Sequence, residues 1–272
     1  MNSSHLDELW KRRGLREPPE PALYLDTVSA TSFAQIYKKR TYFLMEIRRN
    51  SFLLDVGCGT GQDAIEMAGL VGPEGQVVGI DINPAMIAES WKRAEGLKLP
   101  VKFQVEDVHR LSLPDEMFDA ARCDRAVQHM DNPETAIREI IRVTRRGGIV
   151  VVSEPDWETL TIDSQNRDLT RRIANYMSDR AVKQGWIGRQ LWRILKNSGL
   201  REVKVTAFPF IITDYTTADR IWGLQRHARQ ACENAVITES EMVAWQEELI
   251  ELDRRQQFFS STVGFLAFGR KA

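Results

Sequence analysis

The chain has 272 residues, 43% of them hydrophobic, and its 37 Lys and Arg against 38 Asp and Glu leave a net charge of −1. This balance excludes a bulk field that would attract nucleic acid or an anionic membrane, and no apolar stretch approaches the roughly 20 residues that span a bilayer. The beginning of the chain lacks the apolar core of a secretion signal, and three widely spaced cysteines indicate neither a disulfide frame nor a zinc site. We therefore expect a cytoplasmic protein without a metal centre.

Residues 1–50 differ in pattern from the rest of the chain. A proline-rich break at 17–21 precedes an amphipathic helical pattern around Ser32 to Arg48. We expect these residues to form an N-terminal helical cap.

Residues 51–81 hold the most informative pattern of the chain. Leu53 and Leu54 suit a strand that is buried on both faces. Glycines at 57, 59 and 61 allow a sharp turn and a close backbone approach to a ligand, and the helix after them presents free N–H groups to an anion. A second strand ends on Asp81, which can accept hydrogen bonds from both hydroxyls of a ribose. The pattern predicts a nucleoside cofactor across the two strand ends.

Two cofactors fit this spacing. Gly59, Gly61 and Ala64 satisfy the loose G-x-G-x-x-G/A pattern of nicotinamide and flavin dinucleotide sites. The same run, taken from Asp55, reads D-x-G-x-G-x-G, which fits S-adenosylmethionine.

The pattern then alternates strands and helices as far as residue 153, which predicts a parallel sheet with right-handed crossovers. Asn83-Pro84 and Asn132-Pro133 each supply an N-cap and a proline at the first helical position. Residues 102–106 and 149–153 read as strands.

Beyond residue 156 the pattern is mainly helical. We expect a helical insertion at 157–187, then a C-terminal part of the core (188–272) with a strand at 203–212 and a last strand at 258–270. This part carries a second helical insertion at about 217–257. The insertions suit a lid over a substrate or, for 217–257, an interface between copies of a homo-oligomer.

Four stretches resemble the class I S-adenosylmethionine-dependent methyltransferases, especially the ubiquinone/menaquinone-biosynthesis type and the small-molecule methyltransferases of natural-product pathways. They are the glycine run at 55–61, the third strand at 103–108, the fourth strand and its loop at 118–125, and a Gly-Gly turn with the fifth strand at 142–155. The resemblance covers about 51–156, the expected cofactor-binding core. It implies a Rossmann-like, mostly parallel seven-stranded sheet with an antiparallel last strand and helices on both faces, and it favours S-adenosyl-L-methionine over a dinucleotide.

The resemblance also implies the cofactor contacts. Asp81 meets the ribose, Asp107 the adenine amino group, and Asp55 orients the glycine loop or meets the amino group of the methionine moiety. Arg125 is a candidate partner of the cofactor's carboxylate, although a surface salt bridge explains it equally well. The full set of expected cofactor-binding residues is Tyr24, Asp55, Gly57, Gly59, Thr60, Gly61, Asp81, Ile82, Met86, Glu106, Asp107, Val108, Asp124 and Arg125.

Methyl transfer from a sulfonium requires alignment of donor and acceptor more than catalytic side chains. His129, just beyond the fourth strand, and Glu154, after the fifth, are the catalytic candidates, and Asp156 is a further acid at the same edge. For each of them, bracing a loop is the structural alternative.

We expect transfer of a methyl group to a small, partly apolar metabolite. An RNA or protein methyltransferase would need a basic surface, for which only Lys38-Lys39-Arg40 and Arg171-Arg172 are candidates. A non-catalytic scaffold that keeps the fold and binds a partner is the third hypothesis.

Overall fold

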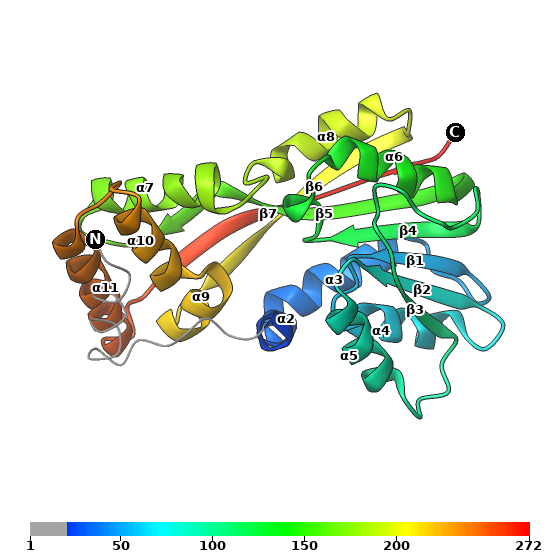
Figure 1. Ribbon diagram of the computed structural model, residues 1–272, viewed down its shortest axis with the longest axis horizontal. Coiled ribbons are helices and arrows are strands. Elements are labelled where there is room, and N and C mark those ends of the chain that lie inside the picture. The colour runs from blue at the N-terminus through cyan, green and yellow to red at the C-terminus, as the bar shows by residue number, and fades with distance from the viewer. Residues whose placement is uncertain (1–20) are drawn as a thin grey trace. The chain divides into compact units, whose positions relative to one another are not determined.

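The computed structural model describes residues 21–272 (Figure 1). The proline-rich break and the preceding part of the expected N-terminal cap lie outside the described residues, except for Pro21. The elements are, in chain order, α2 (Pro21–Ala30), α3 (Ser32–Leu44), β1 (Phe52–Val56), α4 (Gln62–Val71), β2 (Gln76–Asp81), α5 (Pro84–Ala94), β3 (Val101–Val105), β4 (Phe118–Asp124), the 3₁₀ turn η1 (Val127–His129), α6 (Pro133–Val143), β5 (Thr144–Ile162), α7 (Arg167–Tyr176), the π-helical turn η2 (Met177–Ala181), α8 (Ile187–Asn197), β6 (Arg201–Ile212), α9 (Tyr215–Trp222), α10 (Leu224–Glu233), α11 (Glu239–Arg254) and β7 (Ser260–Arg270).

The strands form one seven-stranded sheet in the order β3-β2-β1-β4-β5-β7-β6. The pairs β1/β2, β1/β4, β2/β3 and β4/β5 are parallel. The backbone of β7 runs opposite to β5, because Gly147 N donates to Lys271 O near one end and Asp163 N donates to Phe259 O at the other. The predicted Rossmann-like sheet with an antiparallel last strand is confirmed. Strand order reverses between β1 and β4, which is the switch point where such sheets bind ligands.

Helices cover both faces of this sheet. On one face Ile137 and Ile140 of α6 and Leu191 of α8 join a buried cluster with β1, β4 and β5. On the other face Met67 and Ala68 of α4 join a second buried cluster that reaches β1, β2 and β5. Leu53 and Leu54, which point to opposite faces of β1, are both fully buried, as a strand covered on two sides requires.

The two predicted helix starts are confirmed at Pro84 and Pro133. The side-chain oxygen of Asn83 accepts a hydrogen bond from Ala85 N at 2.9 Å, and that of Asn132 accepts one from Thr135 N at 3.0 Å. Each asparagine therefore satisfies a backbone donor that the first helical turn leaves free.

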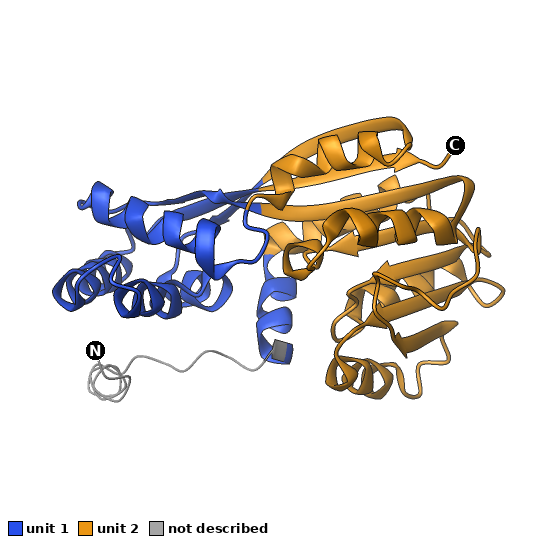
Figure 2. Ribbon diagram, turned by 45° about the horizontal axis from the view of Figure 1, so that its top comes forward, with its two compact units in different colours: residues 1–31, 156–185, 209–263 blue, residues 32–155, 186–208, 264–272 orange. Residues whose placement is uncertain are grey.

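The chain divides into two compact units (Figure 2). Unit 2 comprises residues 32–155, 186–208 and 264–272, and unit 1 comprises, of the described residues, 21–31, 156–185 and 209–263. The expected boundary after residue 50 lies instead after residue 31, whereas the expected boundaries after residues 156 and 187 lie within two residues of those observed, after 155 and 185. Helix α3 belongs with the sheet rather than with a separate cap, and the two expected helical insertions share one unit.

Two helical expectations need correction. Strand β5 continues to Ile162, so residues 157–162 are extended and not part of a helical insertion. Thr159 Oγ1 and Thr262 Oγ1 lie 3.0 Å apart, which joins this extension to β7. The predicted helical stretch at 217–257 is broken into three helices, because Gly223 adopts a left-handed φ of 65° and Thr238 caps a new helix at Glu239.

The apolar side chains of the second insertion form a core inside unit 1. Five large apolar residues of this stretch are at most 5% exposed, namely Ile221, Trp222, Leu224, Trp245 and Leu249. Trp245 Nε1 donates to Thr170 Oγ1 of α7 at 3.0 Å. Within residues 21–272, no helix combines the length and hydropathy that crossing a bilayer requires.

Candidate cofactor site

The glycine loop between β1 and α4 has no room for a side chain at Gly57 or Gly61. Gly57, Gly59 and Gly61 all adopt positive φ values of 68°, 54° and 77°. A Cβ on Gly61 would lie 2.7 Å from the Phe103 ring, and one on Gly57 would lie 2.4 Å from Ala126 Cβ. The backbone of the loop is therefore bare at the N-terminus of α4, which is the arrangement that binds anionic groups.

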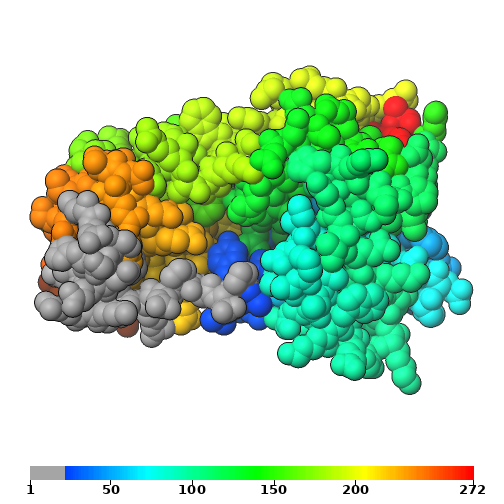
Figure 3. Space-filling model, in the orientation of Figure 1, coloured from blue at the N-terminus to red at the C-terminus, as the bar shows by residue number. Residues whose placement is uncertain are grey.

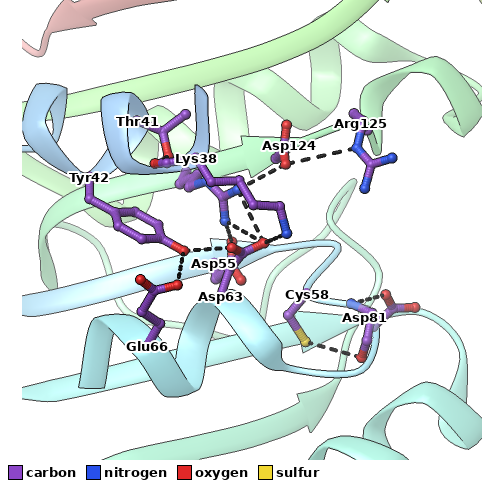
Figure 4. Close-up of polar contacts among 12 residues, drawn as sticks. Lys38, Thr41, Tyr42, Asp55, Cys58, Asp63, Glu66, Asp81, Asp124 and Arg125 are labelled. Atoms are coloured by element: carbon purple, nitrogen blue, oxygen red, sulfur yellow. Dashed lines mark hydrogen bonds and ion pairs between the residues drawn. The ribbon is translucent and has the colours of Figure 1, made fainter. Parts of the chain in front are cut away.

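Asp81 ties the end of β2 to this loop. Its Oδ2 accepts a hydrogen bond from Gly59 N at 3.0 Å, and its Oδ1 accepts one from Asn83 N at 2.9 Å (Figure 4). Ser90 Oγ donates to Gly59 O at 2.8 Å from the other side. Because each carboxylate oxygen has two lone pairs, Asp81 keeps acceptor capacity for ribose hydroxyls while it orients the loop.

The expected adenine residues follow β3. Asp107 is half-exposed, and its Oδ1 accepts hydrogen bonds from the backbone N–H and the ring Nδ1 of His109. Glu106 is engaged within the same segment by Ser112. Val108 is buried, whereas Ile82 at the end of β2 is 69% exposed, an unusual exposure for a large apolar side chain beside a ligand site.

A buried arginine, which was not among the predicted site residues, lies behind the loop. Arg122 of β4 is 1% exposed. Its guanidinium contacts Asp55 at 3.2 Å, Asp63 at 3.2 Å and Asp124 at 2.9 Å. An arginine in a strand that is otherwise buried requires acidic partners. The position of Arg122 in an apolar strand was therefore a signal in the sequence that could have predicted a buried ion pair.

Helix α3 completes this group of charges, which we call the Arg122 cluster: Lys38, Tyr37, Tyr42, Asp55, Asp63, Arg122 and Asp124. Lys38 Nζ lies 2.8 Å from Asp63 Oδ2, and Tyr42 OH donates to Asp63 Oδ1 (Figure 4). Tyr37 OH donates to Asp124 Oδ2 at 3.0 Å and its ring stacks on Phe208. The cluster joins α3, α4, β1 and β4 through charge-assisted hydrogen bonds.

The carboxyls of the cluster differ in how they hold their protons. Burial, only partly offset by Arg122, raises the pKa of Asp55 to about 7. Although burial opposes it, the pKa of Asp63 is held well below its usual range by Arg122 and Lys38. Asp55 rather than Asp63 is therefore the carboxyl that carries a proton at mildly acidic pH.

This protonation makes the unfolding free energy depend on pH. Between pH 4 and 7 the folded protein keeps a proton on Asp55 that the unfolded chain releases, so the contribution of Asp55 to stability falls as pH rises, by up to about 1.4 kcal/mol per pH unit. Asp55→Asn, which imitates the protonated carboxyl, should remove this part of the slope. Urea unfolding of both proteins at pH 5, 6, 7 and 8 measures the difference, and parallel stability profiles would contradict the assignment.

Asp124 has a buried carboxylate oxygen that lacks a hydrogen-bond partner within the described part of the chain. No described residue forms a hydrogen bond with its Oδ1, although the side chain is only 6% exposed. It lies at the end of β4, two residues before Ala126, which contacts the glycine loop. The neighbouring Arg125 has its Nε 4.0 Å from Asp124 Oδ2 and a backbone φ of 53°. Its expected contact with a cofactor carboxylate stays a prediction.

The catalytic candidates occupy different environments. His129 is exposed at the end of η1. Glu154 is fully buried, burial raises its pKa well above the usual value, and its Oε1 accepts a hydrogen bond from Val127 N at 2.6 Å. Through this hydrogen bond Glu154 braces the turn that carries His129, and its catalytic role stays a prediction.

The other two candidates lie in unit 1. Asp156 is fully buried in β5, and Tyr24 is half-buried on α2. Their contacts with substrate or cofactor stay predictions. Within the described part of the chain, no group of three or more His, Cys, Asp or Glu side chains is arranged to hold a metal ion.

A glycine loop after β1, an acid at the end of β2 and a carboxylate at the end of β4 define a nucleoside-cofactor protein with a doubly wound α/β sheet. Residues 47–199 match a family model described as a methyltransferase domain. The chain therefore belongs to the methyltransferase domain family, in the class that uses S-adenosyl-L-methionine, and the alternative of a dinucleotide cofactor is excluded.

Individual relatives agree with this membership. The chain is 37% identical over 213 residues to an uncharacterized 37.1 kDa protein of transposon TN4556 from Streptomyces fradiae, covering 78% of this chain and 61% of that one. It is 32% identical over 132 residues to a ubiquinone/menaquinone biosynthesis C-methyltransferase of Pseudomonas fluorescens, covering 48% and 52%. The chain thus spans about half to three-fifths of these relatives' length.

A solved structure shows the same fold. It is phosphoethanolamine N-methyltransferase 2 of Haemonchus contortus in complex with S-adenosyl-L-methionine, and it superposes with a TM-score of 0.59 over 92% of this chain and 57% of that one. The sequences are 17% identical, so the likeness concerns the fold alone.

Proposed function

We propose that the protein transfers a methyl group from S-adenosyl-L-methionine to a small, partly apolar metabolite by in-line displacement. The observation that carries the methyl-transfer part is the meeting of the glycine loop, Asp81 and Asp124 at the ends of β1, β2 and β4. The likeness to a C-methyltransferase of quinone biosynthesis supports a small acceptor.

The donor supplies an activated methyl group with a good leaving group, and the protein has to bind, orient and exclude water. Asp81 and the glycine loop hold the nucleoside, and the buried Oδ1 of Asp124 suits the ammonium group at the other end of the cofactor. The base in this proposal is His129, which is exposed at the end of η1 and would take a proton from the acceptor.

His129→Ala is expected to lower kcat by about 100-fold or more, the usual contribution of a general base. The affinity for S-adenosylmethionine should stay unchanged, because the loss concerns the acceptor's proton. His129→Gln, which keeps a hydrogen-bonding side chain without a base, should be equally slow. Wild-type turnover of His129→Ala across pH 6 to 9 would exclude a role as base.

Each of the two basic stretches that an RNA or protein methyltransferase would use has one residue held in ion pairs. Lys38 is buried against Asp63, and Arg172 pairs with Glu241 and Asp168. The exposed cations that remain in these stretches are Lys39, Arg40 and Arg171, a small number for binding a macromolecule, which favours a small acceptor.

The proposal is tested by incubating the protein with methyl-labelled S-adenosylmethionine and metabolite extracts. Label should pass into low-molecular-weight products, and Asp81→Ala should abolish the transfer. Transfer only into RNA or protein would overturn the proposed substrate class. Absence of transfer with intact cofactor binding would favour the scaffold hypothesis. The homo-oligomer expected through the helical insertions stays a prediction, which the mass in solution would test.

A further inference from the structure

Helix α8 carries a cationic and aromatic surface on the side that faces away from the sheet. Its apolar residues Ile187, Leu191 and Ile194 are buried in a cluster with the strands of unit 2. Figure 3 shows the helix, in yellow-green, on the surface of the molecule. Because α8 buries one face on the sheet, only its opposite face is available to a partner.

The charges on this exposed face all have the same sign. Arg189, Arg193 and Lys196 are exposed, and their spacing of four and then three residues places them on one face of the helix. From Trp186 to Arg201, which begins β6, the chain contains no Asp or Glu. Although the whole chain has a net charge of −1, this segment is locally positive.

Two exposed tryptophans accompany these cations. Trp186, the N-cap of α8, is 44% exposed, and Trp192, one turn before Lys196, is 43% exposed. Lys196 Nζ lies 5.0 Å from the centre of the Trp192 ring. Tryptophan has a large apolar body with one polar N–H, and it is enriched where a protein meets the boundary between lipid and water.

We propose that this face of α8 docks the protein on an anionic lipid surface. The α8 patch, as we call it, consists of Trp186, Arg189, Trp192, Arg193 and Lys196. The three cations attract the lipid phosphates, and the two indole rings enter the headgroup region. The docking goes beyond the proposed methyl transfer, and it would bring the protein to the phase in which a partly apolar acceptor dissolves.

A nucleic acid is the other anionic partner that such a surface could bind. Single strands are held on cationic grooves by bases that stack on exposed aromatic rings. In the α8 patch the ammonium group of Lys196 covers a face of the Trp192 ring on which a base would stack. This contact favours lipid over nucleic acid.

Cosedimentation with lipid vesicles tests the proposal. The wild type should bind vesicles of phosphatidylcholine mixed with phosphatidylglycerol at least about tenfold more tightly than vesicles of phosphatidylcholine alone. High salt should remove most of this preference, because it screens exposed charges. Equal binding to both kinds of vesicle, or binding to neither, would overturn the proposal.

Charge reversal locates the docking surface. Arg193→Glu combined with Lys196→Glu should weaken binding to the mixed vesicles about 25-fold or more, since each cation near an anionic membrane contributes about fivefold. Lys98→Glu combined with Lys102→Glu is the matched control, because it changes the net charge equally at two exposed residues outside the patch. All four side chains are exposed, so both pairs are expected to fold. An equal loss in the two pairs would contradict docking through α8.

The tryptophans are tested separately. Trp192→Ala should weaken binding to the mixed vesicles by about tenfold, because part of the indole leaves water on docking. Trp91→Ala is the matched control, since Trp91 is 47% exposed but lies on α5, and it should bind as the wild type does. Wild-type binding by Trp192→Ala would overturn the proposal.

A last measurement uses polyuridylate, a single-stranded RNA. Binding of the wild type to this RNA without binding to mixed vesicles would assign the α8 patch to nucleic acid and overturn the proposal. Vesicle binding requires neither the cofactor nor the acceptor. Its outcome is therefore distinct from that of the methyl-transfer assay.

Discussion

Arg122→Met is expected to lower the free energy of unfolding by about 3–5 kcal/mol, the usual result of removing one partner from a buried charged group. Methionine fills much of the space but leaves Asp55 and Asp124, whose side chains are 3% and 6% exposed, without their cation. The remaining cations would be Lys38, 2.8 Å from Asp63, and Arg125, whose Nε is 4.0 Å from Asp124. The loss should be largest above pH 7, where Asp55 is also ionised.

Arg145→Met is the matched control. Arg145 makes an ion pair of similar length with Asp119, 2.7 Å, but its side chain is 52% exposed. An exposed pair contributes at most about 1 kcal/mol. Chemical unfolding of both variants at pH 7.5 measures the two losses, and a loss for Arg122→Met as small as that for Arg145→Met would show that the cluster does not stabilise the fold.

Asp81→Ala is expected to weaken binding of S-adenosylmethionine by about 3 kcal/mol, roughly 150-fold, because two hydrogen bonds to a charged acceptor are lost at about 1.5 kcal/mol or more each. The substitution also removes the acceptor that orients Gly59 N, so the loop loses part of its preorganisation. Calorimetric titration of the folded variant measures the change.

Asp81→Asn separates these two contributions. The amide keeps one oxygen that can accept from Gly59 N, but it loses the charge and one of the two acceptors. Its affinity should lie between those of wild type and Asp81→Ala. Unchanged affinity of folded Asp81→Ala for S-adenosylmethionine would remove Asp81 from the cofactor site.

The elements that were predicted correctly depend on neighbours along the chain. The glycine loop, the N-caps at Asn83 and Asn132 and the strands β1 to β4 are each specified within a few residues. The extension of β5 to Ile162 was missed, because the pairing of Thr159 with Thr262 joins residues 103 positions apart. The membership of α3 in unit 2 was missed for the same reason, since Lys38 and Tyr42 bond to Asp63.

In the candidate site, too, some features depend on neighbouring residues in the sequence and others on residues that are distant in the sequence. The candidate cofactor residues in backbone turns and at strand ends could be predicted from spacing, because parallel strands end at a common edge. The contacts of Glu154 and Arg122 could not, because each depends on which group lies opposite in space. Glu154 looks like an exposed acid after a strand, and only its burial against Val127 N shows otherwise.

The sequence by itself determined the type of fold and a nucleoside cofactor, because an acid, three glycines and a second acid at fixed spacing suit such a ligand, and the resemblance of four stretches then favoured S-adenosylmethionine over a dinucleotide. The tertiary structure decided which charges are paired and which carboxyl keeps its proton. The physical reason is that backbone turns are local in sequence, whereas burial and electrostatic pairing depend on residues that are brought together only by the folded sheet.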